Sequence, residues 1–109
     1  MTLTVFAKES GFKPLCIPTP DKEVTGVYIG DLLSWVMGKA EQGNVWITIM
    51  SNINTVAVAA LTDISCILLA EGVVPDEALL SRAQEKGVNI LSTTLSSYEA
   101  AIKISELLN

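Results

Sequence analysis

The stretch VWITIMSNINTVAVAALTD, residues 45–63, predicts a strand, a polar turn and an apolar helix in direct succession. Its first six residues form a continuous apolar run, which is typical of a strand covered on both faces of a parallel sheet. The polar residues of SNINT then interrupt that run. Ser51 and Asn54 belong to the residue types that cap helices, so we interpret the break as a strand-to-helix turn that one of them caps.

The same alternation continues towards the C-terminus. Strands are predicted at residues 66–70 and 88–91, and helices at residues 55–62, 76–86 and 97–108. Pro75 is typical of a helix start and Gly87 of a helix end, while SSYE at residues 96–99 forms a capping box. Short apolar strands alternating with helices indicate right-handed βαβ crossovers, so the fold class is α/β with a parallel sheet.

The N-terminal half carries weaker signals. It predicts a helix over residues 2–10, an edge strand over 14–18, a polar loop over 19–23 and a β-rich run over 24–29. Asp31 is placed to begin the next helix and Gly43 to end it. At 109 residues the chain has the length of one domain, which we assign to residues 1–109.

The composition predicts an apolar surface that needs a cover. Half of the residues are hydrophobic and 17% are charged, against about 25% in an average soluble domain. Within the helix over residues 55–62, the segment VAVAAL at residues 56–61 has no polar side, and a helix of that kind must be covered all round. A second copy of the chain is the commonest cover, so we expect a homodimer and prefer this helix over the one at Asp31 as its interface.

Charge and residue usage exclude several functions. The net charge is −5 and no basic cluster is present, which argues against nucleic-acid binding. The absence of histidine removes Ser-His-Asp triads and the usual zinc sites. Cys16 and Cys66 lie in apolar runs and are expected to be buried free thiols. No phosphate-binding glycine motif occurs. We therefore expect no catalytic residue, no metal and no cofactor.

A membrane span is the alternative interpretation of residues 45–70, because Asp63 is the only charge among them. The polar residues at 51–55 fall near the middle of the first twenty residues of this stretch, which favours strand, helix and strand instead. The N-terminus shows no basic region followed by an apolar run, so no secretory signal is expected. These features predict a cytoplasmic protein without a membrane partner.

Candidate binding residues follow the predicted strands, because ligands of open parallel sheets bind at the carboxyl ends of strands. The three loops concerned are residues 50–55, 71–74 and 92–97, and ordinary helix capping is the alternative role of their polar residues. The candidate ligand-binding residues are Ser51, Asn52, Asn54, Thr55, Glu71, Gly72, Thr93 and Thr94. Asp31, Asp63 and Glu71 also lie near element ends, where capping or solvation is their expected role.

The sequence resembles the DRTGG domain family. The resemblance covers most of the chain, through VTGVYIGDLLSWVM (residues 24–37), WITIMSNINTVAVAALTDISCILLAEG (46–72) and PDEALLSRAQEKGVNILSTTLSSYEAA (75–101). It is strongest to the small stand-alone members, in which GDLLS and WITI recur. Related domains occur in HPr kinase/phosphorylase, in long phosphotransacetylases and between the CBS domains of regulatory pyrophosphatases.

The resemblance implies a three-layer α/β/α sandwich with a mostly parallel sheet that dimerises and has a regulatory or ligand-sensing role without catalysis. The Asp-Arg and Thr-Gly-Gly residues that name the family are absent. The corresponding loops are residues 51–54 and 70–72, of which Gly72 alone matches, so the family's arginine contact is not carried over. The expected function is a non-enzymatic homodimer that binds a small metabolite or a nucleotide. A purely structural module that docks on another protein is the alternative, and an enzyme that uses Asp31, Glu71 or a thiol ranks third.

Overall fold

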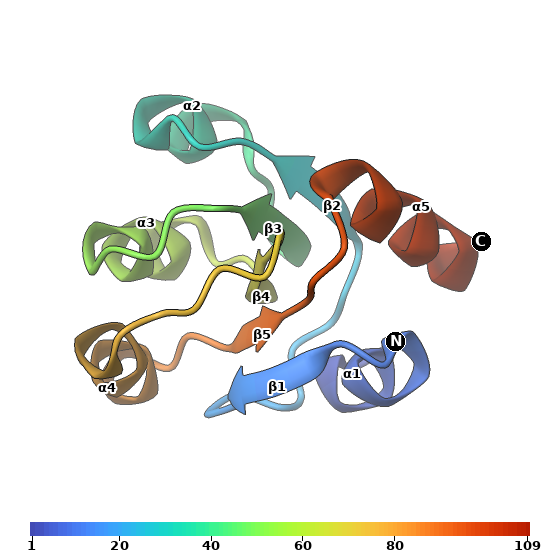
Figure 1. The fold of residues 1–109 in the computed structure, drawn as a ribbon, viewed down its shortest axis with the longest axis horizontal. Helices are drawn as coiled ribbons and strands as arrows, with labels where there is room; N and C mark the ends of the chain where they lie inside the picture. Colours follow the sequence, from blue (N-terminus) through green and yellow to red (C-terminus); the bar gives the residue numbers. More distant parts are fainter.

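The fold is a five-stranded sheet between two layers of helices (Figure 1). The computed structural model describes all 109 residues. In chain order the elements are α1 (Leu3–Ser10), β1 (Lys13–Cys16), β2 (Gly26–Ile29), α2 (Leu33–Lys39), β3 (Asn44–Thr48), α3 (Asn54–Thr62), β4 (Cys66–Leu69), α4 (Glu77–Lys86), β5 (Ile90–Ser92) and α5 (Ser97–Leu108). The predicted α/β/α sandwich is confirmed.

The sheet has the order β1-β5-β4-β3-β2 and is mostly parallel. Strands β2 to β5 are parallel neighbours, and the helices α2, α3 and α4 that connect them cover one face (Figure 1). Helices α1 and α5 cover the other face (Figure 1). Strand β1 lies at the edge and pairs antiparallel with β5, which confirms the edge strand predicted near residues 14–18.

Two hydrophobic cores, one on each face of the sheet, explain the continuous apolar runs of the strands. In β4, Cys66 and Leu68 join the core beneath α1 and α5, whereas Ile67 and Leu69 join the core beneath α2, α3 and α4. All four side chains are fully buried. Burial on both faces therefore explains why successive positions of β4 are all apolar, as in other sheets covered on both faces.

Asp31 does not begin a helix, contrary to the prediction. Helix α2 starts at Leu33 without a side-chain cap. One carboxylate oxygen of Asp31 instead accepts from the Thr48 hydroxyl at 2.6 Å and from the Ile49 N–H at 3.0 Å. The carboxylate thus ties the loop after β2 to the end of β3. Gly43 does not end α2 either, because it forms the turn that leads into β3.

The turn SNINT joins β3 to α3 as predicted, but its cap differs from the prediction. Neither Ser51 nor Asn54 caps the helix; the Asn52 side-chain oxygen accepts from the Asn54 N–H at 2.9 Å. The Thr55 hydroxyl also donates to the Asn52 carbonyl at 2.8 Å. An asparagine side chain can accept a hydrogen bond from the backbone N–H two residues further along the chain and so mimic a backbone turn. This explains why an asparagine stands at position 52.

The predicted capping box is present at α5. The Glu99 N–H donates to the Ser96 hydroxyl and the Ser96 N–H donates to the Glu99 carboxylate, each at 3.1 Å. Both cysteines are free and buried, as predicted, and burial raises the pKa of each thiol. No helix combines the length and the apolar content needed to cross a membrane.

Candidate functional site

The connections after β4 and β5 leave the sheet on opposite faces. These strands are parallel neighbours; the chain after β4 leads to α4 on one face, and the chain after β5 leads to α5 on the other (Figure 1). The connections after β2, β3 and β4 all lead to the same face (Figure 1). Ligands of open α/β sheets bind in the crevice where two neighbouring connections diverge in this way.

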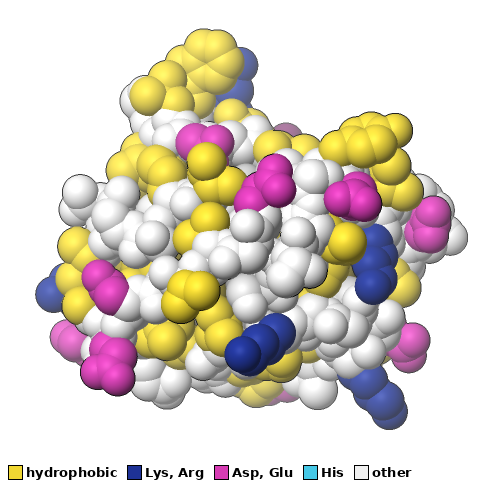
Figure 2. All heavy atoms as spheres, viewed as in Figure 1, with side chains coloured by type: hydrophobic (Ala, Val, Ile, Leu, Met, Phe, Trp, Pro, Cys, Tyr) yellow, Lys and Arg dark blue, Asp and Glu magenta, His cyan; other side chains and the backbone are white.

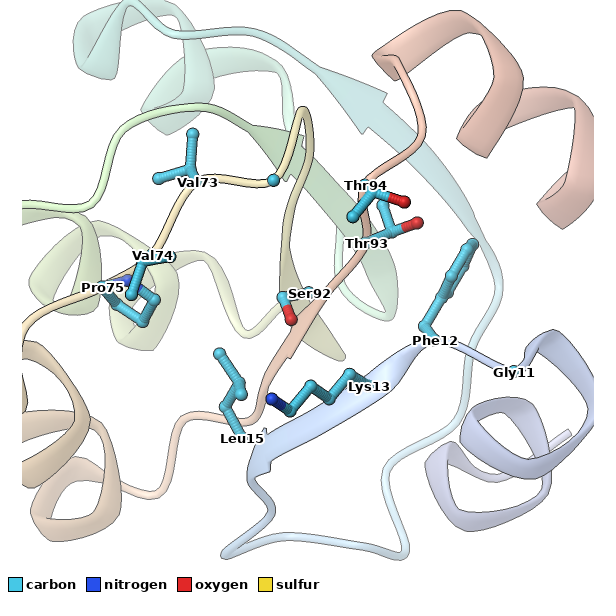
Figure 3. A pocket seen from close by; sticks show the side chains of 11 residues that line it. Gly11, Phe12, Lys13, Leu15, Val73, Val74, Pro75, Ser92, Thr93 and Thr94 are labelled. Atoms are coloured by element: carbon cyan, nitrogen blue, oxygen red, sulfur yellow. The ribbon is translucent and has the colours of Figure 1, made fainter.

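A cavity of about 410 Å³ lies at this divergence, and we name it the β4–β5 cavity (Figure 3). Residues 72–75 of the loop after β4 form one side. Residues 92–94, from the end of β5 and its loop, form another. Residues 11–13 and Leu15, in and before β1, complete the lining. The volume falls within the range of small-molecule pockets, about 300–1,000 Å³.

Backbone hydrogen bonds hold the two loops of the cavity together. The Glu71 N–H donates to the Leu95 carbonyl at 2.8 Å, and the Gly72 N–H donates to the Thr93 carbonyl at 3.0 Å. This geometry requires a left-handed turn, because φ is +61° at Glu71 and +72° at Gly72. Glycine adopts that conformation without steric cost, so Gly72 has a structural reason for its place here. The cavity is therefore preformed.

Several donors of the residues that line the cavity have no partner within the protein. The backbone N–H groups of Val74 and Thr94 donate to no acceptor. The hydroxyl of Ser92 also lies in the cavity, and Lys13 forms no ion pair although it is the one charged residue of the lining. Groups of this kind are those that fix the orientation of a polar ligand in an otherwise apolar pocket.

The structure brings together some of the predicted binding residues and separates others. Gly72, Thr93 and Thr94 line the β4–β5 cavity, and the exposed Glu71 adjoins it. The remaining candidates, Ser51, Asn52, Asn54 and Thr55, lie at the beginning of α3 and do not line it. Of these, Thr55 is fully buried, and Asn54 borders a separate groove of about 310 Å³ between α3 and α4.

The sequence analysis missed the residues that β1 contributes. Lys13 lies opposite Ser92 in the antiparallel pairing of β1 with β5, and Leu15 lines the same cavity. Lys13 and Ser92 are 79 positions apart in the sequence (92 minus 13). No local pattern marks either residue as part of a site, since only the pairing of the edge strand brings them there.

Comparisons with known proteins found a matching family model and a solved structure of similar fold. The model of the DRTGG domain family matches residues 20–107. A solved structure with a similar fold is the CBS and DRTGG regulatory region of a Clostridium perfringens pyrophosphatase, complexed with its activator, diadenosine tetraphosphate. The TM-score is 0.72 at 15% sequence identity, and the match covers 94% of this chain and 45% of that chain. The chain thus spans about half of that structure's length, and no curated protein matches it.

Proposed function

This chain belongs to the DRTGG domain family, and from that premise we propose that it is a regulatory domain that binds a small metabolite of the nucleotide class without transforming it. The single observation that carries this proposal is the preformed β4–β5 cavity at the divergence of two connections. Its unpartnered N–H groups and hydroxyls suit a polar ligand, and its volume suits a small one.

The chemistry of the lining supports binding rather than catalysis. No acidic residue, cysteine or histidine lines the cavity, so no carboxylate, thiol or imidazole lies beside the hydroxyls of Ser92 and Thr94 among the lining residues. Lys13 is the sole titratable side chain of the lining. A regulatory domain needs none of these groups, because it acts through a difference in ligand affinity between two states.

We infer the nucleotide class of the ligand from the protein of similar fold. The pyrophosphatase region of similar fold was crystallised with diadenosine tetraphosphate, which is named as its activator. An adenine base with its sugar needs an apolar pocket with a few polar groups, and the β4–β5 cavity combines the two. A cytoplasmic location stays a prediction.

Binding is tested with a bulky substitution in the cavity. Thr94→Trp places an indole in the lining, whereas Ser81→Trp makes a matched change at an exposed position of α4 that lines no cavity. A nucleotide at a hundredfold excess over its Kd should stabilise the wild type by about 2.7 kcal/mol, which is several degrees in Tm. Thermal-shift assays with adenine and guanine nucleotides should show that shift in the wild type and in Ser81→Trp, but not in Thr94→Trp. An equal shift in all three proteins would place the ligand elsewhere.

We also propose that the domain forms a homodimer through α3. Its inner side is buried, but Ala57, Ala60 and Leu61 are exposed, and Leu61 is 74% exposed. Apolar side chains also project over the neighbouring α2, at the top of Figure 2, where Trp35 is 58% exposed. An apolar surface that extends over two adjacent helices is typical of an interface.

The dimer is tested by placing a charge on that surface. Leu61→Glu should convert a dimer, with twice the 11.6 kDa mass of one chain, into a monomer, because an interface buries the new carboxylate. Ile102→Glu is the control, on the exposed side of α5 on the opposite face of the sheet. Light scattering after size exclusion measures both masses. A wild type that is monomeric at high concentration contradicts the dimer and favours the alternative, a module that docks on another protein.

A further inference from the structure

The β4–β5 cavity is positive in a chain that is negative overall. The chain has twelve acidic and seven basic residues, yet the lining holds one lysine and no acid. A second lysine lies close by, because the Lys103 ammonium is 5.5 Å from the ring centroid of Phe12, which belongs to the lining. Neither lysine forms an ion pair. An unpaired lysine in the lining can attract an anionic group of a ligand.

The positive charge lies on one side of the cavity. Lys13 and Ser92 are opposite one another in the antiparallel pair, so their side chains leave the same face about 5 Å apart. In Figure 3 the Lys13 side chain lies along β1 below the Ser92 hydroxyl. An ammonium and a free hydroxyl at this spacing can both contact one phosphate or carboxylate group.

Another side of the cavity is apolar. Val73, Val74 and Pro75 follow one another there in the loop after β4, whereas Leu15 lies on β1 beside Lys13 (Figure 3). None of the apolar side chains offers a charge or a hydrogen bond. They provide a surface for a planar apolar group such as a nucleobase, so the cavity is divided into an anion side and a base side.

Carboxylates flank the loop that lines the cavity. The lining continues directly into α4, whose N-cap Asp76 already accepts from the Leu79 N–H at 2.9 Å and whose first turn carries Glu77. Glu71 is exposed at the other end of the same loop. These carboxylates lie at the two ends of the loop that lines the cavity, and they repel additional negative charge on a bound ligand. The N-terminus of α5 is closed by its capping box.

From this arrangement, and resting on the function proposed above, we propose that the cavity selects a nucleotide with one phosphate group over the same nucleotide with a polyphosphate chain. The phosphate lies against Lys13 and Ser92, and the base lies against the apolar loop after β4. The single lysine of the lining balances the charge of one phosphate group, and the carboxylates at the rim repel each additional phosphate group.

The test keeps the base constant and varies the charge. Adenosine, AMP, ADP and ATP are titrated without divalent cations, at one ionic strength, by isothermal titration calorimetry. AMP should bind about tenfold or more tightly than adenosine, since a hydrogen bond to a charged group contributes about 1.5–3 kcal/mol. ADP and ATP should bind no more tightly than AMP.

Two lysine variants locate the phosphate. Lys13→Gln removes the charge of the cavity and should reduce AMP affinity about tenfold, to that of adenosine. Lys39→Gln makes the same charge change at the end of α2, outside every cavity of the fold, and should bind AMP like the wild type.

The outcomes separate this inference from the function on which it rests. An affinity that rises from AMP to ATP, adenosine that binds as tightly as AMP, or equal losses in the two lysine variants would overturn the single-phosphate preference while leaving nucleotide binding intact. No binding of any of the four compounds would overturn both proposals.

Discussion

Trp46→Ala should lower the free energy of unfolding by about 3–5 kcal/mol, the usual cost of truncating a buried large aromatic side chain. Trp46 lies in β3, is fully buried and belongs to the core beneath α2, α3 and α4. Its indole N–H also donates to the Gly30 carbonyl at 2.8 Å. The substitution therefore removes both the filling of the core and the partner of a backbone carbonyl. A domain of this kind has about 5–15 kcal/mol of stability in all, so the loss is severe.

The second tryptophan of the chain is the matched control. Trp35 lies on α2 and is 58% exposed, with the Lys39 ammonium 4.4 Å from its ring centroid. Trp35→Ala should cost about 1 kcal/mol or less, since it leaves no cavity and loses one exposed cation–π contact. Urea unfolding followed by circular dichroism measures both variants. Equal costs would contradict the burial that the structure assigns to β3.

Gly43→Ala should destabilise the protein by about 2–4 kcal/mol, as the sum of backbone strain and overpacking. The φ angle of Gly43 is +84°, and a Cβ there would lie 2.5 Å from the Thr25 hydroxyl oxygen and 3.1 Å from the Glu23 carbonyl oxygen. Thr25 cannot move away easily, because its N–H donates to the Gly43 carbonyl at 2.9 Å and its hydroxyl to the Gln42 carbonyl at 3.0 Å.

Gly38→Ala is the control, and its effect on the stability of the protein should have the opposite sign. Gly38 lies inside α2, and a Cβ there would meet no atom within 4 Å. Alanine is favoured over glycine in a helix by about 0.5–1 kcal/mol, so this variant should be more stable than the wild type. Thermal and urea unfolding of the two variants give the signs. A neutral Gly43→Ala variant would show that the turn before β3 can relax.

The repeating part of the fold could be predicted from the sequence because its signals are local. The continuous apolar runs at β3, β4 and β5 reflect burial on both faces, and the capping box at Ser96 and Glu99 marks the start of α5 unambiguously. The role of Asp31 could not be predicted in this way. Its partners, Thr48 and Ile49, become neighbours only when β2 pairs with β3.

Half of the candidate site could be predicted from the sequence. The loops after β4 and β5 follow strands, so the rule for parallel sheets points to Gly72, Thr93 and Thr94. The same rule points equally to the turn before α3, because a sequence does not show on which face a connection leaves the sheet. The charge of the site comes from Lys13 on an antiparallel edge strand, whose partner only the folded sheet defines.

The position at which a nucleotide binds is measured residue by residue by a ¹⁵N–¹H correlation spectrum titrated with AMP, and separately with ATP. We predict saturable shifts of the amide signals of residues 72–74 and 92–94, which line the β4–β5 cavity, while the signals of residues 51–55 stay unchanged. Shifts confined to residues 51–55, or no saturable shift with either nucleotide, would contradict nucleotide binding in the β4–β5 cavity.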